Sequence, residues 1–87
     1  MKEVVYSSKA RKDIKRIQHD PEKMEALASV LFRLANGETL GKEHKPHPLK
    51  GDYKGCMECH IKDDYLLIWV DNDCIRVVRV GSHSELF

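Results

Sequence analysis

The longest apolar run in the 87-residue chain is Tyr65-Leu66-Leu67-Ile68-Trp69-Val70. Its length and its aromatic and β-branched content predict a strand, at about 64–70, that is buried on both faces. Two flanking strands are predicted at about 53–61 and 74–80. The connections between the three strands, Lys62-Asp63 and Asp71–Asp73, are short and polar, which indicates hairpins. We therefore expect an antiparallel meander with the apolar run in its central strand.

The N-terminal segment has the pattern of a short strand followed by a helix. Residues 3–7 combine β-branched and aromatic residues, as strands do. Ser7 or Ser8 can then cap a helix that runs to about Gln18. The apolar side of this helix is made of Ala10, Ile14 and Ile17.

A second helix is predicted after Asp20 and Pro21, because the carboxylate can cap it and the proline suits its first turn. Its core-facing stripe is Met24, Leu27, Leu31 and Leu34. Gly37 ends it, since glycine adopts the left-handed conformation that follows many helices. Residues 38–52, rich in glycine and proline, are expected to be loop. The prediction is one α+β domain over 1–87, with an N-terminal strand and an αα-hairpin packed on a small antiparallel-rich sheet.

Composition favours a water-soluble protein of the cytoplasm. Hydrophobic residues make up 41% of the chain, charged residues make up 33%, and the net charge is +1. No apolar run approaches the roughly 20 residues of a membrane span. The first residues lack the apolar core of a secretory signal. The three cysteines are therefore expected to be free thiols.

Positive charge is concentrated in two segments. The first contains Lys9, Arg11, Lys12, Lys15 and Arg16, with Asp13 as its single acid. The second contains Lys42, Lys45, Lys50 and Lys54, interleaved with His44, His47 and Tyr53. Such segments can follow a nucleic-acid backbone, because neutralising phosphates releases counterions. A solvated helix face and a lysine-rich loop would explain the same charges.

The C-terminal half carries an ordered set of polar motifs. These are His47-Pro48-Leu49-Lys50-Gly51, then His60 with Asp64, then Arg79, then Gly81-Ser82-His83-Ser84-Glu85-Leu86-Phe87. In order and spacing the set resembles the YafQ branch of the RelE-type toxins of bacterial toxin–antitoxin pairs. The helix pair before it also fits, so the resemblance covers nearly the whole chain. Tyr65 stands where relatives have tryptophan, and the loop at Asp71–Asp73 is one residue shorter.

The resemblance implies two helices packed on a small antiparallel-rich sheet and a metal-independent, cofactor-free endoribonuclease that cleaves mRNA on the ribosome. By position, the implied catalytic residues are His47, His60, Asp64, His83 and Phe87. Arg79 matches the family's phosphate-binding arginine, and Lys50 and Lys54 are further candidates for RNA phosphates. Tyr65 and Phe87 are candidates for stacking on a base. The implied partners are a cognate antitoxin and, only through the antitoxin complex, operator DNA.

These residue types suit RNA cleavage. RNA supplies its own nucleophile, the 2′-hydroxyl, so the protein must move protons and stabilise charge. Histidine suits both proton transfers because its unperturbed pKa of about 6.5 lies near neutral pH. Our hypothesis makes His60 and His47 the base side and His83 the acid for the leaving 5′-oxygen, although the two roles could be reversed. Arg79 would hold the phosphate oxygens, and Asp64 would orient a histidine.

Strand alternation makes this hypothesis testable. It places Lys54, Cys56, Glu58 and His60 on one face. A two-residue turn at Lys62-Asp63 would put Tyr65 opposite His60, and a three-residue loop at Asp71–Asp73 would pair Tyr65 with Arg79. Arg79 would then share the face of His60, whereas a two-residue loop would put it on the opposite face.

Other interpretations compete with this one. Cys56-Met57-Glu58-Cys59-His60 matches the C-x-x-C-H signature of haem attachment, and its cysteines could ligate zinc. On a strand, however, Cys56 and Cys59 face opposite ways, which favours core thiols. A relative of the same fold could instead poison DNA gyrase, or act only as the antitoxin-bound half of a repressor complex. A lone histidine is more often a surface residue, as we expect for His19 and His44, and Arg79 could merely pair with an acid.

Overall fold

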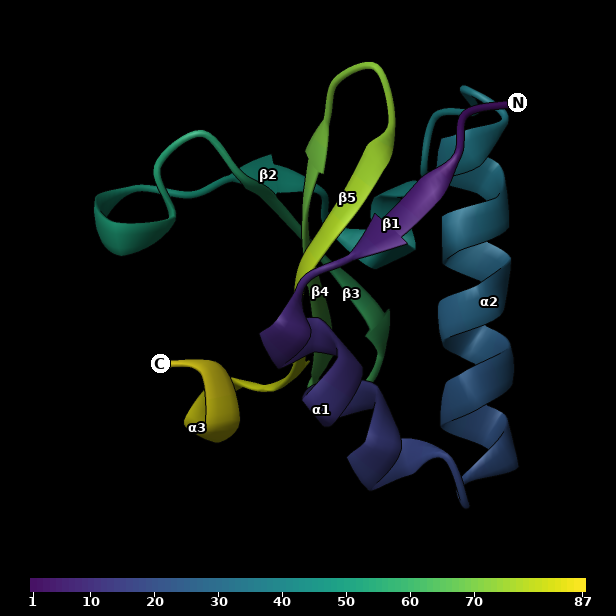
Figure 1. Ribbon diagram of the computed structural model, residues 1–87, viewed down its shortest axis with the longest axis vertical. Coiled ribbons are helices and arrows are strands. Elements are labelled where there is room, and N and C mark those ends of the chain that lie inside the picture. Colours follow the sequence, from purple (N-terminus) through teal and green to yellow (C-terminus); the bar gives the residue numbers. More distant parts are fainter.

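The computed structural model describes all residues, 1–87, and has the predicted α+β architecture (Figure 1). Its strands are β1 (Val4–Tyr6), β2 (His47–Pro48), β3 (Met57–Lys62), β4 (Tyr65–Asp71) and β5 (Ile75–Ser82). They form one sheet in the order β1-β5-β4-β3-β2. Only β1 runs parallel to its neighbour, β5, and the other pairs are antiparallel. The helices are α1 (Ser8–Ile17), α2 (Pro21–Ala35) and the short α3 (His83–Leu86).

The two long helices begin at the predicted caps. The Ser7 hydroxyl accepts a hydrogen bond from the Ala10 amide at 2.9 Å, and the Asp20 carboxylate accepts one from the Lys23 amide at 3.2 Å. Gly37 follows α2 with a φ of +74°, which only glycine adopts freely. Local sequence therefore sets where both helices begin and where the second one ends.

The sheet buries apolar side chains on both faces, but unequally. The larger cluster lies under α1 and α2 and includes Cys59, Ile61, Tyr65, Leu67, Trp69, Ile75, Val77 and Val80. The smaller cluster on the opposite face is built from Leu66, Ile68 and Leu86, with Leu49, Tyr53, Cys56 and Val78 packed around them. Strand β4 contributes to both clusters, which confirms that the apolar run is central. No helix combines the length and apolar character needed to cross a membrane.

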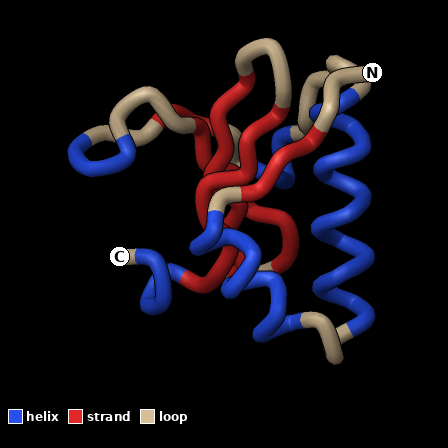
Figure 2. Tube along the Cα trace, in the orientation of Figure 1, coloured by secondary structure: helices blue, strands red, loops and turns tan.

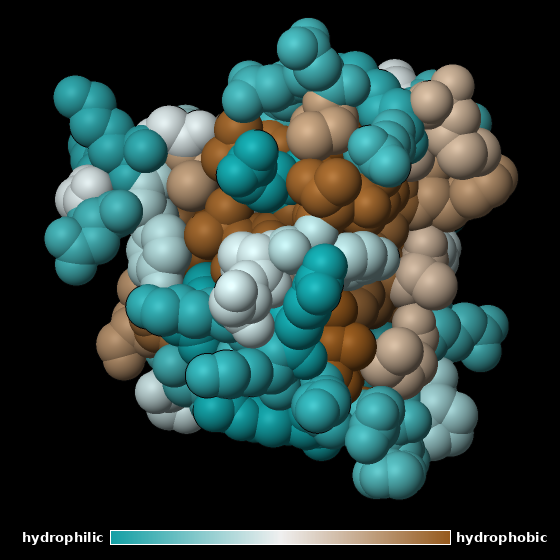
Figure 3. Space-filling view, in the orientation of Figure 1, coloured by the Kyte–Doolittle hydropathy of each residue, from teal (hydrophilic) through white to brown (hydrophobic).

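Between the helices the core reaches the surface. Ile14, Met24, Leu27 and Leu31 line a groove between α1 and α2, with Arg11 and Lys15 at its edge. Figure 3 shows hydrophobic atoms exposed along this side of the molecule, whereas the loop that projects between β2 and β3 is hydrophilic. Figure 2 shows that loop as a long excursion from the sheet, on the same side as the C-terminus.

Several predicted boundaries were wrong. Residues 53–56 are not strand, because a 3₁₀ turn at Gly51–Tyr53 and a tight turn precede β3. Two short elements were also missed, β2 within the predicted loop 38–52 and α3 at the C-terminus. Strand β2 forms because its backbone pairs with β3. Helix α3 forms where the end of the chain folds back over the sheet.

The predicted register around Tyr65 was also wrong. The turn consists of Asp63 and Asp64, with Asp63 at a φ of +47°, so Lys62 pairs with Tyr65 and His60 pairs with Leu66. A shift of one residue exchanges the faces of a strand. Tyr65 therefore faces the helices and does not lie opposite His60.

Arg79 nevertheless lies on the predicted face. The loop before β5 is three residues long, but it comprises 72–74, and a bulge opposite Ile68 and Trp69 shifts the later pairing. Arg79 pairs with Ile68 instead of Tyr65. Since Ile68 and Leu66 share a face, and Leu66 lies opposite His60, Arg79 shares the face of His60. The expected placement is confirmed, although the residue that pairs with Arg79 was predicted wrongly.

Candidate active site

The candidate site lies on the sheet face opposite α2, where α3 folds back against β5 and β4. The start of α3 is fixed by reciprocal bonds between Ser82 and Glu85: the Glu85 carboxylate accepts from the Ser82 amide at 2.9 Å, and the Ser82 hydroxyl accepts from the Glu85 amide at 3.3 Å. Leu86 is buried in the smaller core cluster. These contacts hold His83 and Phe87, at the two ends of α3, over the sheet.

His83 is paired with a carboxylate. Its Nδ1 lies 2.5 Å from Oδ1 of Asp64, which belongs to the turn between β3 and β4. Both side chains are exposed, at 55% and 63%, and the hydrogen bond to His83 lowers the pKa of the Asp64 carboxyl. Because a carboxylate can only accept, the proton of this bond belongs to Nδ1. Nε2 of His83 is left to face a substrate.

His60 faces His83 across the site. The centroids of the two rings are 6.0 Å apart and the ring planes are tilted by 60°. Nδ1 of His60 lies 3.2 Å from the Asp63 carbonyl oxygen, which is a neutral acceptor. Nδ1 of His60 therefore donates as well, so the neutral form of this ring has its lone pair on Nε2. The structure thus brings together His60, His83 and Asp64, three of the predicted catalytic residues.

His44 is not the solvated surface residue that we expected. Only 16% of its side chain is exposed, and its Nδ1 lies 2.7 Å from the carbonyl oxygen of His60. This bond ties the 3₁₀ turn at Lys42–His44 to strand β3 at the position of His60. The turn directly precedes His47, so His44 anchors the segment that carries a second predicted catalytic histidine.

His47 bonds to a buried acid that sequence reasoning did not single out as functional. Its Nδ1 lies 2.7 Å from the Lys45 carbonyl oxygen, and its Nε2 lies 3.2 Å from Oε1 of Glu58. Glu58 is only 3% exposed, and its Oε2 has no hydrogen-bond partner. Strand alternation did place Glu58 on the face of His60. An acidic residue within an otherwise buried strand was the sequence feature that could have identified it as a functional candidate. Since Nδ1 donates to a carbonyl, the contact with Glu58 requires a second proton, carried by the imidazole or the carboxyl.

Arg79 pairs with Asp13 of α1. Its Nε and Nη2 donate to the two oxygens of Asp13 at 2.7 and 3.1 Å, and the Val80 amide donates to the same carboxylate at 3.0 Å. The carboxylate raises the pKa of Arg79 further above its high usual value. Asp13, 3% exposed, was missed as a functional residue. Its position between Ala10 and Ile17, on the apolar side of the helix, was the signal that could have found it.

The aromatic candidates differ in accessibility. Phe87 is 63% exposed, and its ring centroid lies 6.1 Å from that of His83. Tyr65 is only 5% exposed, with Lys23 Nζ 5.0 Å from its ring centroid, and burial raises the pKa of its hydroxyl. The expected stacking of a base on Tyr65 is therefore wrong, because the displaced turn directs its ring into the core.

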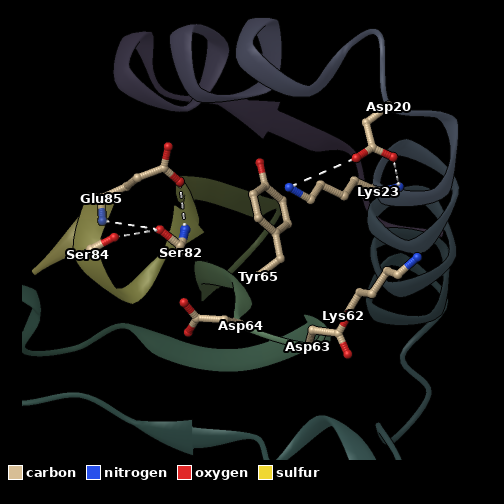
Figure 4. A pocket seen from close by; sticks show the side chains of 9 residues that line it. All are labelled: Asp20, Lys23, Lys62, Asp63, Asp64, Tyr65, Ser82, Ser84 and Glu85. Carbon is tan, nitrogen blue, oxygen red and sulfur yellow. Dashed lines mark hydrogen bonds and ion pairs between the residues drawn. The ribbon is translucent and has the colours of Figure 1, made fainter.

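Tyr65 instead borders a polar pocket of about 610 Å³ that Asp64 also lines (Figure 4). Asp64 and Ser84 line this pocket on the side of α3, and Asp20 and Lys23 line it on the side of α2. Lys50 and Lys54, the predicted phosphate contacts, lie outside it. Both are exposed in the projecting loop, which lies along the chain between His47 and His60.

Comparison with known proteins assigns the family. The model of the family described as "Bacterial toxin of type II toxin-antitoxin system, YafQ" matches residues 2–87. The chain belongs to the YafQ family of toxins. It is 33% identical to the mRNA interferase toxin YafQ of Escherichia coli strain K12, over 99% of this chain and 96% of that protein.

Solved structures of bacterial toxins superpose closely on this one. A metal-bound toxin from Helicobacter pylori has a TM-score of 0.89 at 38% identity, with both chains fully covered. The toxin chain of the E. coli DinJ–YafQ toxin–antitoxin complex has a TM-score of 0.86 at 33% identity, over 99% of this chain and 97% of that one. The resemblance drawn from the motifs and the predicted fold are therefore both confirmed.

The cysteines of this YafQ-family chain do not form a joint site. Cys59 lies in the core under the helices, whereas Cys56 packs on the opposite face of the sheet, and all three thiols are free. Burial, together with the charge of Glu58, raises the pKa of the Cys59 thiol to about 12. Cys56 and Cys59 therefore cannot hold one haem or one metal ion between them.

Proposed function

We propose that this chain is an endoribonuclease toxin that cleaves mRNA by attack of the 2′-hydroxyl, with His60 as general base and His83 as general acid. The proposal rests on the facing pair of imidazoles, 6.0 Å apart, each with Nδ1 held by an oxygen and Nε2 free. A phosphodiester placed between the rings would have its 2′-oxygen near one Nε2 and its 5′-oxygen near the other, within the roughly 3 Å reach of proton transfer.

The two oxygen partners support this assignment of roles. The Asp63 carbonyl accepts from Nδ1 of His60, so the neutral form of this imidazole presents its lone pair at Nε2, where it can take the 2′-hydroxyl proton. The Asp64 carboxylate stabilises an imidazolium at His83, which can give its Nε2 proton to the leaving 5′-oxygen. His47 belongs to the base side, where its Nε2 lies 3.2 Å from Oε1 of Glu58.

Arg79 is proposed to stabilise the charge on the non-bridging oxygens. Asp13 occupies Nε and one N–H of Nη2, and the Tyr53 hydroxyl also bonds to the guanidinium, which still leaves N–H groups for a phosphate. The same ion pair fixes the plane of the guanidinium before substrate arrives, as electrostatic stabilisation of a transition state requires. Only charge and proton transfer are used in this mechanism, so cleavage should continue in EDTA.

We also propose an antitoxin partner. The E. coli relative is known in complex with the antitoxin DinJ, and the groove between α1 and α2 offers a partner a mostly apolar lining edged by Arg11 and Lys15. We further propose that the toxin acts on ribosome-bound mRNA. It would bind operator DNA only as part of the complex with its antitoxin.

Expression under tight control tests the proposed function. We expect growth arrest together with new mRNA 5′ ends in primer extension, and we expect both to disappear in His83→Ala. His19→Ala is the matched control, because His19 is an exposed histidine outside the site. Arrest without new ends, unchanged in His83→Ala, would refute the nuclease and favour a gyrase poison.

A further inference from the structure

A second hollow lies next to Phe87 and has no role in the mechanism above. It has a volume of about 520 Å³ and is lined by Lys9, Lys50, Asp52, Tyr53, Leu86 and Phe87. These residues come from the start of α1, from the loop between β2 and β3, and from α3. Figure 1 shows the projecting loop and α3 on the same side of the molecule, with the N-terminal end of α1 nearby.

The hollow has an aromatic wall. The rings of Tyr53 and Phe87 meet edge to face, with centroids 5.8 Å apart and an interplanar angle of 82°. Tyr53 is half-buried against the smaller core cluster, which fixes its ring. Phe87 stays 63% exposed, so a planar ligand can lie on it. An ordered aromatic side chain with an open face is the usual platform on which single-stranded nucleic acid stacks.

The rim of the hollow carries positive charge that the protein does not use. Lys9 and Lys50 are both exposed, and neither takes part in an ion pair. Asp52 is the one acid among the lining residues. Lysines in this state can neutralise a phosphate without giving up an internal partner.

The hollow is also continuous with the catalytic cluster. Phe87 lies between Tyr53 and His83, with ring centroids 5.8 and 6.1 Å away respectively. A ligand that stacks on Phe87 therefore lies next to a phosphate held between His60 and His83.

We propose that this hollow is a subsite for the nucleotide adjoining the scissile phosphate of single-stranded RNA. The base stacks on Phe87 against the edge of Tyr53, and the phosphate of that nucleotide lies between Lys9 and Lys50. The inference rests on the proposed nuclease function and adds Lys9 and Tyr53 to the residues that bind substrate. Because every base has a π-face, this subsite contributes affinity and alignment to any sequence.

Binding of an RNA that cannot be cleaved separates this subsite from catalysis. The probe is a fluorescein-labelled single-stranded oligonucleotide with 2′-O-methyl groups throughout, measured by fluorescence anisotropy over a range of salt. Lys9→Glu should weaken binding about tenfold and make the slope of log K against log salt shallower by about 0.7, the value for one phosphate contact on a single strand. Lys12→Glu, on the same helix but outside the hollow, is the matched control and should change binding less than about twofold.

Tyr53 provides a second pair of variants. Tyr53→Leu should weaken binding about fivefold or more, the lower end of the range for base stacking, whereas Tyr53→Phe keeps the ring and should stay within about twofold. Thermal melts of all four variants identify any that fail to fold.

The outcomes distinguish the subsite from the nuclease. If Lys9→Glu and Lys12→Glu weaken binding equally, or if the wild-type protein does not bind the probe, the subsite is overturned even where RNA is cut. If the variants differ as expected but the protein cuts no RNA, the subsite stands and the proposed function falls. Selective loss of binding to an acidic peptide, with RNA binding unaffected, would overturn the subsite and assign the hollow to a protein partner.

Discussion

The ion pair between Asp13 and Arg79 joins α1 to β5, and its removal should destabilise the fold sharply. Asp13→Ala deletes the acceptor for two guanidinium bonds at 2.7 and 3.1 Å and for the Val80 amide at 3.0 Å. Val80 is 1% exposed, so its N–H cannot turn to water. The Arg79 side chain is 15% exposed and can recover only part of its hydration.

These contacts set the magnitude. Breaking a buried ion pair by removing one partner costs about 3–5 kcal/mol, and the partial exposure of Arg79 places this case at about 3 kcal/mol. For a domain of this size, that loss lowers the melting temperature by about 12–24 °C. Arg16→Ala is the matched control, because Arg16 Nη1 is 3.5 Å from Asp13 and its side chain is 60% exposed. Its loss should cost less than about 0.5 kcal/mol.

Urea unfolding of the wild type, Asp13→Ala, Arg79→Ala and the double variant gives the coupling energy directly. We expect about 2 kcal/mol or more between the two side chains. A coupling below about 0.5 kcal/mol, as for exposed pairs, would refute the claim that Asp13 holds Arg79 in place.

Three further predictions concern single groups. The pKa of the Asp64 carboxyl, followed by carbon-13 NMR, should lie below its usual value and return to it in His83→Ala. Because the folded-state pKa is the lower one, the pair stabilises the fold above about pH 4 and loses that contribution as the pH falls through the folded-state value. An unchanged titration in the variant would contradict the pairing of His83 with Asp64. The buried Cys59 thiol, with a pKa of about 12, should resist a thiol reagent at pH 8 until urea unfolds the chain; labelling of the native protein at this position, detected by mass spectrometry, would show that the burial is wrong. His44→Ala should lower kcat about tenfold with little change in KM, and His44→Gln, which keeps an N–H donor for the His60 carbonyl, should recover part of it; equal losses in both variants would rule out the bond as the cause.

The elements that sequence predicted correctly depend on local patterns. Ser7 and Asp20 cap the helices through bonds to residues three positions away. The apolar run in β4 needs no knowledge of its neighbours, since a strand covered on both faces has no polar side. In these places, the residues within one turn or one strand are sufficient to predict the element.

The errors arose where contacts between segments distant in sequence determine the structure. The turn at Asp63 and Asp64 moved by one residue from its predicted place and turned Tyr65 from the site to the core. Asp13 and Arg79 are 66 positions apart, so neither segment alone identifies the other as its partner. The reciprocal bonds of Ser82 and Glu85 do have a readable signature, serine followed three residues later by glutamate, and α3 could have been predicted from it.

The candidate site was only partly predictable for the same reason. The motifs identified His47, His60, Asp64 and His83, but not how they pair. The pairing of His83 with Asp64 and the bond of His60 to a carbonyl depend on the turn and on the fold-back of α3. The assignment of His60 as base and His83 as acid depends on those contacts.

The chemistry of the RNA ends tests the central claim most directly, namely that the 2′-hydroxyl is the nucleophile and that His60 and His83 move the protons. A short synthetic RNA cut by the purified protein in EDTA, with its products weighed by mass spectrometry, should yield a 2′,3′-cyclic phosphate and a 5′-hydroxyl. A single 2′-deoxy residue at the cleaved position should abolish the cut. Products with a 5′-phosphate and a 3′-hydroxyl, or undiminished cleavage of the deoxy substrate, would contradict the mechanism.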